Sequence, residues 1–165
     1  DIIATLVQKY SATQKIMILS SDKDFAQLQR YPNVEQYSPI LKKFIKEPLP
    51  LLQLKQLIIR GDKSDGVPNI LTKDDVFVTG GRQKPITEAK IIGWMNQEPK
   101  EFCNEDMLRN FSRNETLIDL SKIPESLKEK ILDTYDNAKG KTKQQFMNYM
   151  IANRLKNLIE VIDEF

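Results

Sequence analysis

The chain has 165 residues, of which 40% are hydrophobic and 29% are charged, and its formal net charge is +2. These values are typical of one globular domain or of a compact half of something larger, and no apolar run reaches the roughly 18 residues needed to span a bilayer. Histidine is absent and Cys103 is the only cysteine, which excludes histidine-dependent catalytic triads and a disulfide framework, and fits a reducing cytoplasm. Any bound metal must use oxygen ligands, which favours magnesium or manganese.

The N-terminal part of the chain is expected to belong to an α/β fold. Apolar residues at helical spacing predict an amphipathic helix over 2–10. The short apolar run 15–19 predicts a buried strand, and helical character resumes at 25–29. This helix–strand–helix order indicates a parallel sheet. Two further strands, 34–37 and 41–45, are expected to pair around the intervening Ser-Pro.

From Pro50 onward the chain is expected to be mostly helical, with Pro50 at a favoured first helical position. Further helices are predicted at 85–95, 105–112, 124–136 and 142–163. The polar stretch 61–69 and the irregular stretch 72–84 are interpreted as loops. The chain is therefore divided into an α/β part, 1–49, and a helical part, 50–165.

Two carboxylates, Asp22 and Asp24, follow the predicted strand 15–19. The carboxyl end of a parallel strand faces the crevice where α/β folds bind ligands, and paired carboxylates suit Mg²⁺. Alternatively, one of the two caps the following helix. The residues alone leave both interpretations open.

A second acidic pair lies in the segment 60–68. Asp62 and Asp65 are three residues apart, so both could lie on one face of a helical turn and reach one cation. Gly61 and Gly66 permit a positive φ and a close approach of the backbone to a phosphate. The alternative is a polar turn between two helices.

Together these motifs resemble signatures of the 5′-nuclease and flap-endonuclease superfamily. The segment 60–68 is similar to its Gly-Asp-x-x-Asp-Asn/Gly-(hydrophobic)-Pro signature, and 20–25 is similar to Ser-x-Asp-x-Asp-(aromatic/hydrophobic). The segment 1–6 resembles the end of its upstream Glu-Ala-Asp-Asp motif. The stretch 117–124 and the final Glu164-Phe165 resemble the ribonucleases H of T-even bacteriophages in particular, so the resemblance covers nearly the whole chain.

The resemblance implies a metal-dependent 5′→3′ exonuclease and flap endonuclease that removes RNA primers during DNA replication. The implied fold is a PIN-like (resolvase-like) α/β parallel-sheet remnant, followed by a helical subdomain with a helix-hairpin-helix-type DNA-binding motif at about 57–95. The complete enzyme would use two Mg²⁺ ions, for which Mn²⁺ can substitute. By motif position, catalysis would involve Asp22, Asp24, Asp62 and Asp65. The metal ligands would be these four and Asp1.

The resemblance also implies that the hairpin binds DNA, an RNA–DNA duplex or a flap through backbone phosphates. The residues carried over to this contact are Gly66, Val67, Asn69, Gly81, Lys84, Thr87 and Lys90. Relatives often hold K⁺ through carbonyls of this hairpin, but the long irregular stretch 72–84 departs from their compact pattern and argues against a potassium site. A single-strand-binding protein or sliding clamp is a further expected partner, and a membrane is not.

Other acidic ligands of the family lie in its first half, upstream of the position that Asp1 matches. The chain is therefore expected to be the second half of such an enzyme and to be inactive alone. One alternative is a non-catalytic, structure-specific DNA-binding module, and another is half of a split nuclease. A magnesium enzyme of the topoisomerase–primase class would explain Asp22 and Asp24 but not the segment 60–68.

Overall fold

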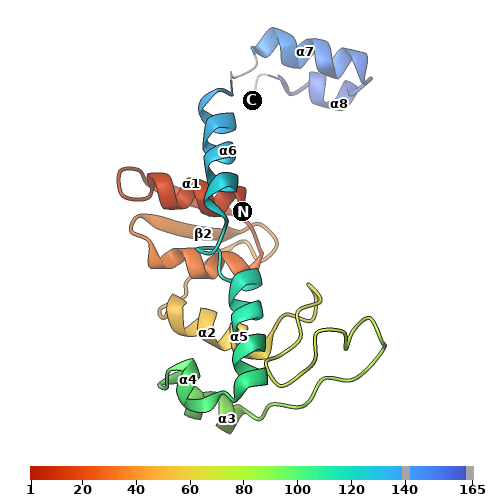
Figure 1. Ribbon diagram of the computed structural model, residues 1–165. Coiled ribbons are helices and arrows are strands. Elements are labelled where there is room, and N and C mark those ends of the chain that lie inside the picture. The colour runs from red at the N-terminus through yellow and green to blue at the C-terminus, as the bar shows by residue number, and fades with distance from the viewer. Residues whose placement is uncertain (139–141, 163–165) are drawn as a thin grey trace. The chain divides into compact units, whose positions relative to one another are not determined.

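The computed structural model of the chain describes residues 1–138 and 142–162 (Figure 1). The chain divides into two compact units, the first running from Asp1 to Leu132 and the second beginning at Asp133. The first unit begins with two helices and three strands. These are α1 (Ile2–Tyr10), β1 (Ile16–Leu19), the 3-10 helix η1 (Lys23–Arg30), β2 (Val34–Ser38) and β3 (Lys43–Ile45). The predicted helix–strand–helix order and the two following strands are confirmed. The prediction that the first strand is buried is wrong here, because Met17 and Leu19 are exposed and only Ile18 is buried.

The three strands form one mixed sheet in the order β1-β2-β3. β1 and β2 are parallel, with Leu19 opposite Tyr37, while β2 and β3 are antiparallel, with Tyr37 opposite Phe44. The rings of Tyr37 and Phe44 meet edge to face with centroids 5.3 Å apart. Parallel strands require a crossover connection, which η1 supplies here. The acidic motif after β1 therefore lies where the chain leaves the carboxyl end of that strand.

One hydrophobic core lies between α1, β1 and η1. Its buried members are Ala4, Val7, Ile18, Leu28 and Ile123. Ile123 lies between the predicted helices 105–112 and 124–136, so residues from both predicted parts of the chain, 1–49 and 50–165, share this core. Gln27 reinforces the contact, because its side chain donates to the carbonyl of Ile118 at 3.0 Å and accepts from the N–H of Leu120 at 2.9 Å.

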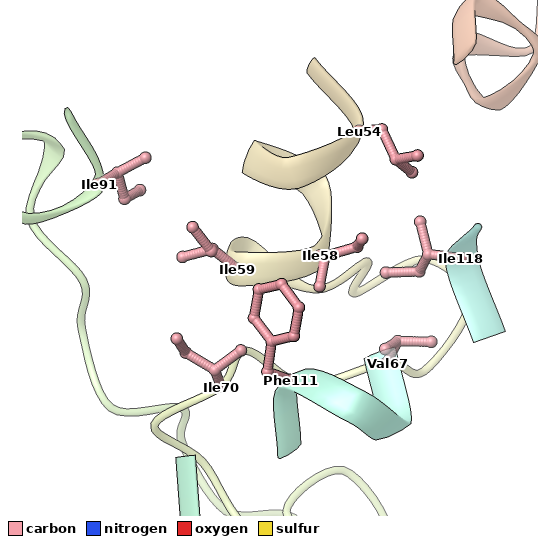
Figure 2. Packing of buried hydrophobic residues seen from close by; sticks show 8 residues of the cluster. All are labelled: Leu54, Ile58, Ile59, Val67, Ile70, Ile91, Phe111 and Ile118. Carbon is pink, nitrogen blue, oxygen red and sulfur yellow. The ribbon is translucent and has the colours of Figure 1, made fainter. Parts of the chain in front are cut away.

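The regular elements in the rest of the first unit are all helices, and a long segment without helix, 61–87, separates the first two of them. Its elements are α2 (Pro50–Arg60), α3 (Glu88–Met95), α4 (Pro99–Phe102), α5 (Glu105–Ile118) and the start of α6 (Glu125–Asp136). A second core holds α2 and α5 together, as Figure 2 shows from close by. Its buried members are Leu54, Ile58, Ile59, Val67, Ile70, Ile91, Phe111 and Ile118. The apolar face of α2 therefore packs against α5 and against the loop that carries the second acidic motif.

Several predicted boundaries in this region were wrong. α3 begins at Glu88 rather than Pro85, because the Thr87 side chain accepts a hydrogen bond from the N–H of Lys90 and so fixes the start of the helix. α5 continues beyond residue 112 to Ile118, whose side chain is buried in the second core. The short α4 was not predicted. The stretch 72–84 contains turns and neither helix nor strand, as expected.

In the second unit the predicted single helix 142–163 is wrong. The structure has two helices there, α7 (Lys143–Ala152) and α8 (Lys156–Ile159). The break follows from the backbone, because Arg154 has a φ of 56°, which no α-helix accommodates. Residue 163 and the predicted phage-like ending Glu164-Phe165 lie outside the described residues. Within the described ranges, no helix combines the length and apolar character needed to cross a membrane.

Candidate functional site

Three carboxylates from two elements converge in the first unit. Asp24 lies in η1, whereas Asp62 and Asp65 lie in the turn that follows α2. One oxygen from each of the three lies within 4.8 Å of the others. The packing of η1 against α2 brings the two sequence motifs together. We name these three residues the acidic cluster.

Asp62 is the buried member of the acidic cluster, with a side chain only 5% exposed. Its Oδ1 accepts hydrogen bonds from the backbone N–H of Ser64, at 2.9 Å, and from the Ser64 hydroxyl. Among the residues that the structure describes, its Oδ2 accepts no hydrogen bond of good geometry, but the Lys23 ammonium lies 2.9 Å away and forms an ion pair with it. The bonds from Ser64 lower the pKa of Asp62 to about 2, against the opposing effect of burial. Asp62 is therefore ionised at neutral pH.

Asp24 has the opposite electrostatic character. Its Oδ1 is buried and makes no hydrogen bond among the described residues. Burial raises the pKa of Asp24, and the negative charges of Asp22, Asp62 and Asp65 raise it further. A buried carboxylate oxygen without a partner is costly unless a cation compensates it. The donor set of the acidic cluster, which is all oxygen and all carboxylate, fits a hard divalent cation.

Two residues that the sequence proposed as metal ligands lie outside this group. The side chain of Asp22 accepts a hydrogen bond from the N–H of Asp24 at 3.0 Å and so caps η1, which is the alternative that the sequence left open. Its charge nevertheless acts on Asp24. Asp1 is exposed at the start of α1 and makes no capping bond there. The metal-binding roles of Asp1 and Asp22 stay predictions.

The turn that carries Asp62 and Asp65 is closed tightly on itself. The N–H of Val67 donates to the carbonyl of Asp62 at 2.7 Å, which forms an isolated antiparallel bridge. Gly61, with φ +67°, lies so close to this bridge that a Cβ on it would be 2.3 Å from the Val67 carbonyl oxygen. Gly66 has φ +74° but open space around it. Gly61 is thus required by close approach as well as by backbone conformation.

Sequence reasoning missed the residues that hold this turn in place. Asn114 of α5 is fully buried, and its Nδ2 donates to the carbonyls of Ile58 at 2.8 Å and Pro68 at 2.9 Å. One helical turn earlier in α5, the Nδ2 of Asn110 donates to the carbonyls of Ile70 at 3.0 Å and Thr72 at 3.2 Å. The sequence did hold a signal for these residues. The two asparagines are four residues apart and lie on the helix face that also carries the apolar Phe111 and Ile118, which indicates that their side chains are buried.

The residues proposed to contact nucleic acid fall into two groups. Val67 and Asn69 are buried. The Asn69 side chain donates to the Lys84 carbonyl at 2.8 Å and accepts from the N–H of Leu71 at 3.0 Å, so it joins the two ends of the stretch 72–84. The remaining five residues are exposed and are Gly66, Gly81, Lys84, Thr87 and Lys90. Contact with nucleic acid stays a prediction for both groups.

The start of α3 carries charge of both signs. Thr87 caps the helix, and Lys90 lies in its first turn. Glu88, also in the first turn, forms an ion pair with Arg60 at the end of α2. A helix N-terminus offers backbone N–H groups to a phosphate. The neighbouring Glu88 carboxylate is held by Arg60, which reduces its repulsion of such an anion.

Comparison with known proteins agrees with the motifs. A family model described as the C-terminal part of T4 RNase H matches residues 50–165. The chain is also 32% identical over 173 residues to the protein named Ribonuclease H of Enterobacteria phage T4, and the match covers 100% of the chain and 57% of that protein. The chain therefore spans little more than half the length of this relative. Because the family model covers most of its residues, the chain belongs to the T4 ribonuclease H family.

Proposed function

We propose that the chain is the C-terminal part of a metal-dependent 5′→3′ exonuclease and flap endonuclease, which hydrolyses phosphodiester bonds and removes RNA primers during DNA replication. Membership of the T4 ribonuclease H family supports a nuclease. The observation that carries the metal dependence is the convergence of Asp24, Asp62 and Asp65 within 4.8 Å.

Mg²⁺ is the ion that this donor set suits best, and Mn²⁺ can substitute for it. Ser64 donates to Oδ1 of Asp62, whereas Oδ2 accepts no hydrogen bond from Ser64 and faces a cation, at present the Lys23 ammonium. Asp24 contributes a buried oxygen from the opposite motif, and Asp65 contributes an exposed one. When bound, divalent cations polarise a phosphodiester and stabilise the attacking and leaving oxygens. In the complete enzyme we propose two such ions, with Asp22 and Asp1 as additional ligands.

The nucleic-acid contact is proposed at the exposed end of the segment 57–95. The N-terminal turn of α3 and the Lys84 and Lys90 ammonium groups would bind backbone phosphates without reading sequence. The buried Asn69 would act indirectly, by holding the loop in place. An RNA–DNA duplex, a flap and a nicked duplex all present such phosphates. Since the stretch 72–84 is long and irregular, we propose no potassium site in it.

We further propose that the 165-residue chain does not cleave nucleic acid alone. Two cations require more oxygen ligands than the three carboxylates of the acidic cluster supply. The edge strand β1 also exposes Met17 and Leu19, by 57% and 69%. Exposed apolar side chains on a sheet edge are usually covered in a functional protein. Further polypeptide would both cover this strand and add ligands.

The test compares Asp62→Asn and Asp24→Asn with Asp75→Asn, which makes the same charge change on an exposed residue outside the acidic cluster. Mn²⁺ binding is measured by calorimetry. We expect each cluster variant to lose about tenfold or more in affinity, while Asp75→Asn binds as the wild type does. Equal affinity in all four proteins would contradict the metal site.

The same proteins are assayed on a 5′-flap and an RNA–DNA hybrid with Mg²⁺. We expect binding of both substrates without cleavage. Cleavage by the wild-type chain would contradict the proposed inactivity but not the metal site. Substrate binding without any Mn²⁺ binding would instead favour a non-catalytic DNA-binding module.

A further inference from the structure

Lys23 places a positive charge against the acidic cluster. It is the first residue of η1 and lies between Asp22 and Asp24 in the sequence. Its Nζ lies 2.9 Å from Oδ2 of Asp62. The Lys23 side chain is 62% exposed, whereas that of Asp62 is 5% exposed. The contact therefore joins a solvated ammonium to a buried carboxylate, which distinguishes it from a pair of two surface charges.

The two oxygens of Asp62 have different surroundings. Both hydrogen bonds from Ser64 go to Oδ1. Oδ2 has no hydrogen bond among the described residues, and the Lys23 ammonium is the cation that contacts it. Oδ2 is also the oxygen left available for a metal ion. Lys23 thus contacts the atom that a divalent cation would use.

The Lys23 ammonium and a divalent cation compete for the same negative charge. The acidic cluster brings three carboxylates together, and an ammonium group offsets one negative charge. A divalent cation offsets two and coordinates the oxygens directly. Two positive charges a few ångströms apart repel strongly beside buried groups, where solvent screening is weak. An ion coordinated by Oδ2 of Asp62 would therefore disfavour the Lys23 contact.

We propose that Lys23 is a tethered counter-ion: its ammonium group neutralises Asp62 when no divalent cation is bound, and it leaves Oδ2 when one binds. This inference rests on the proposed function, since it supposes that the acidic cluster takes a divalent cation. Lys23 is then a positioning residue that sets metal affinity. It stabilises the metal-free protein and weakens apparent metal binding, and the flexible four-carbon stem lets the ammonium move into solvent.

The test replaces Lys23 by methionine, which keeps most of the side-chain volume and removes the charge. Lys63→Met is the matched control, because Lys63 is exposed beside Asp62 and forms no ion pair in the part of the chain that the structure describes. Mn²⁺ binding is measured by calorimetry at low ionic strength. We expect Lys23→Met to bind Mn²⁺ about tenfold more tightly than the wild type, and Lys63→Met to bind within about twofold of it.

Thermal denaturation gives a readout that is independent of nuclease activity. Without metal, we expect Lys23→Met to unfold a few degrees below the wild type and Lys63→Met, because Asp62 loses its counter-charge. Saturating Mn²⁺ should then raise the unfolding temperature of Lys23→Met more than that of the other two proteins. In the wild type, the carbon NMR resonance of the Lys23 Cε should shift on Mg²⁺ addition toward the value of a free lysine.

The possible failures are distinct. If wild-type protein binds Mn²⁺ but Lys23→Met binds it equally or more weakly, Lys23 is not a competing counter-ion and only this inference is overturned. If no protein of the set binds Mn²⁺, the proposed metal site is overturned together with it. An unfolded Lys23→Met protein would leave the NMR titration of the wild type to decide, and an unchanged Lys23 resonance on metal binding would overturn the inference.

Discussion

Asp62 shows how one neighbour can decide the protonation of a buried acid. Burial alone would raise the pKa of its carboxyl group. Instead, two hydrogen bonds from Ser64 lower it to about 2, with help from Lys23. Asp24, a few ångströms away, lacks such donors, and its pKa is raised. The two carboxylates thus differ because Ser64 and Lys23 stabilise the charged form of Asp62, whereas burial and the neighbouring negative charges act on Asp24 without such donors.

This contrast predicts how stability depends on pH. The pKa of Asp62 is lower in the folded protein than its ordinary value of 3.8, so its stabilising contribution is complete above pH 3.8 and is lost as the pH falls through about 2. The contribution is on the order of 2 kcal/mol. Asp24 acts with the opposite sign, because its raised pKa favours the protonated form in the folded state. Acidification therefore relieves a penalty at Asp24.

Ser64→Ala tests the argument. Loss of the hydroxyl donor should raise the pKa of Asp62 and lower the free energy of unfolding at neutral pH by about 1 kcal/mol. The loss of stability on acidification should also be smaller than in the wild type and should end at a higher pH, because the pKa of Asp62 in the folded protein lies closer to its ordinary value of 3.8. Urea denaturation between about pH 2 and 7 measures both effects. Ser112→Ala, on the exposed surface of α5, is the control. Superimposable pH profiles for the two variants would contradict the assigned role of Ser64.

At the scale of elements, local patterns were sufficient where an element is bounded by its own sequence. The run that forms β1 is apolar and short, and the Pro50 start of α2 is a standard helix beginning. The end of α5 was missed because Ser112, Arg113 and Asn114 look polar enough to end a helix. Asn114 is instead fully buried and bonded to carbonyls of α2 and its loop. Only tertiary contacts show this.

The same distinction applies to the site. The spacing within each acidic motif could be read from the sequence, and so could the prospect that Asp22 acts as a cap. The convergence of Asp24 with Asp62 and the contact of Lys23 with Asp62 could not, because both depend on how η1 packs against α2. The break after α7 also had no proline or glycine to announce it, since it lies at Arg154.

Asn114 provides the test at this scale. Asn114→Ala removes the Nδ2 donor, so the buried carbonyls of Ile58 and Pro68 each lose a hydrogen bond. We expect the free energy of unfolding to fall by about 1–3 kcal/mol, with weaker Mn²⁺ binding because the turn that carries Asp62 is less firmly held. Chemical denaturation and calorimetry measure the two effects. If Asn114→Ala matches the Ser112→Ala control in both, α5 does not support the site.

At the scale of the whole molecule, the two hydrophobic cores lie within one unit. Every buried member of both clusters falls between Ala4 and Ile123, inside the unit that ends at Leu132. All three residues of the acidic cluster lie there too. The family match, by contrast, begins at residue 50 and leaves out α1 and the sheet. The region that the family model matches is therefore different from the region that the cores define as a folding unit.

Two truncated chains test whether the site depends on the folding unit that the cores define or only on the region that the family model matches. A chain of residues 1–138 keeps every residue of both clusters and removes only the buried residues of the second unit, so we expect it to unfold cooperatively within a few degrees of the full chain and to bind Mn²⁺ with the same affinity. A chain of residues 50–165 keeps the second core but loses Asp24 and exposes Ile123, which packs on α1 and β1 in the intact protein. We expect it to be less stable and to bind Mn²⁺ at least about tenfold more weakly, because one of three carboxylate ligands is missing.

Circular dichroism, thermal denaturation and calorimetry on both chains measure these differences. Equal Mn²⁺ affinity in the two truncated chains would show that the site does not need η1, and the assignment of Asp24 would then be wrong.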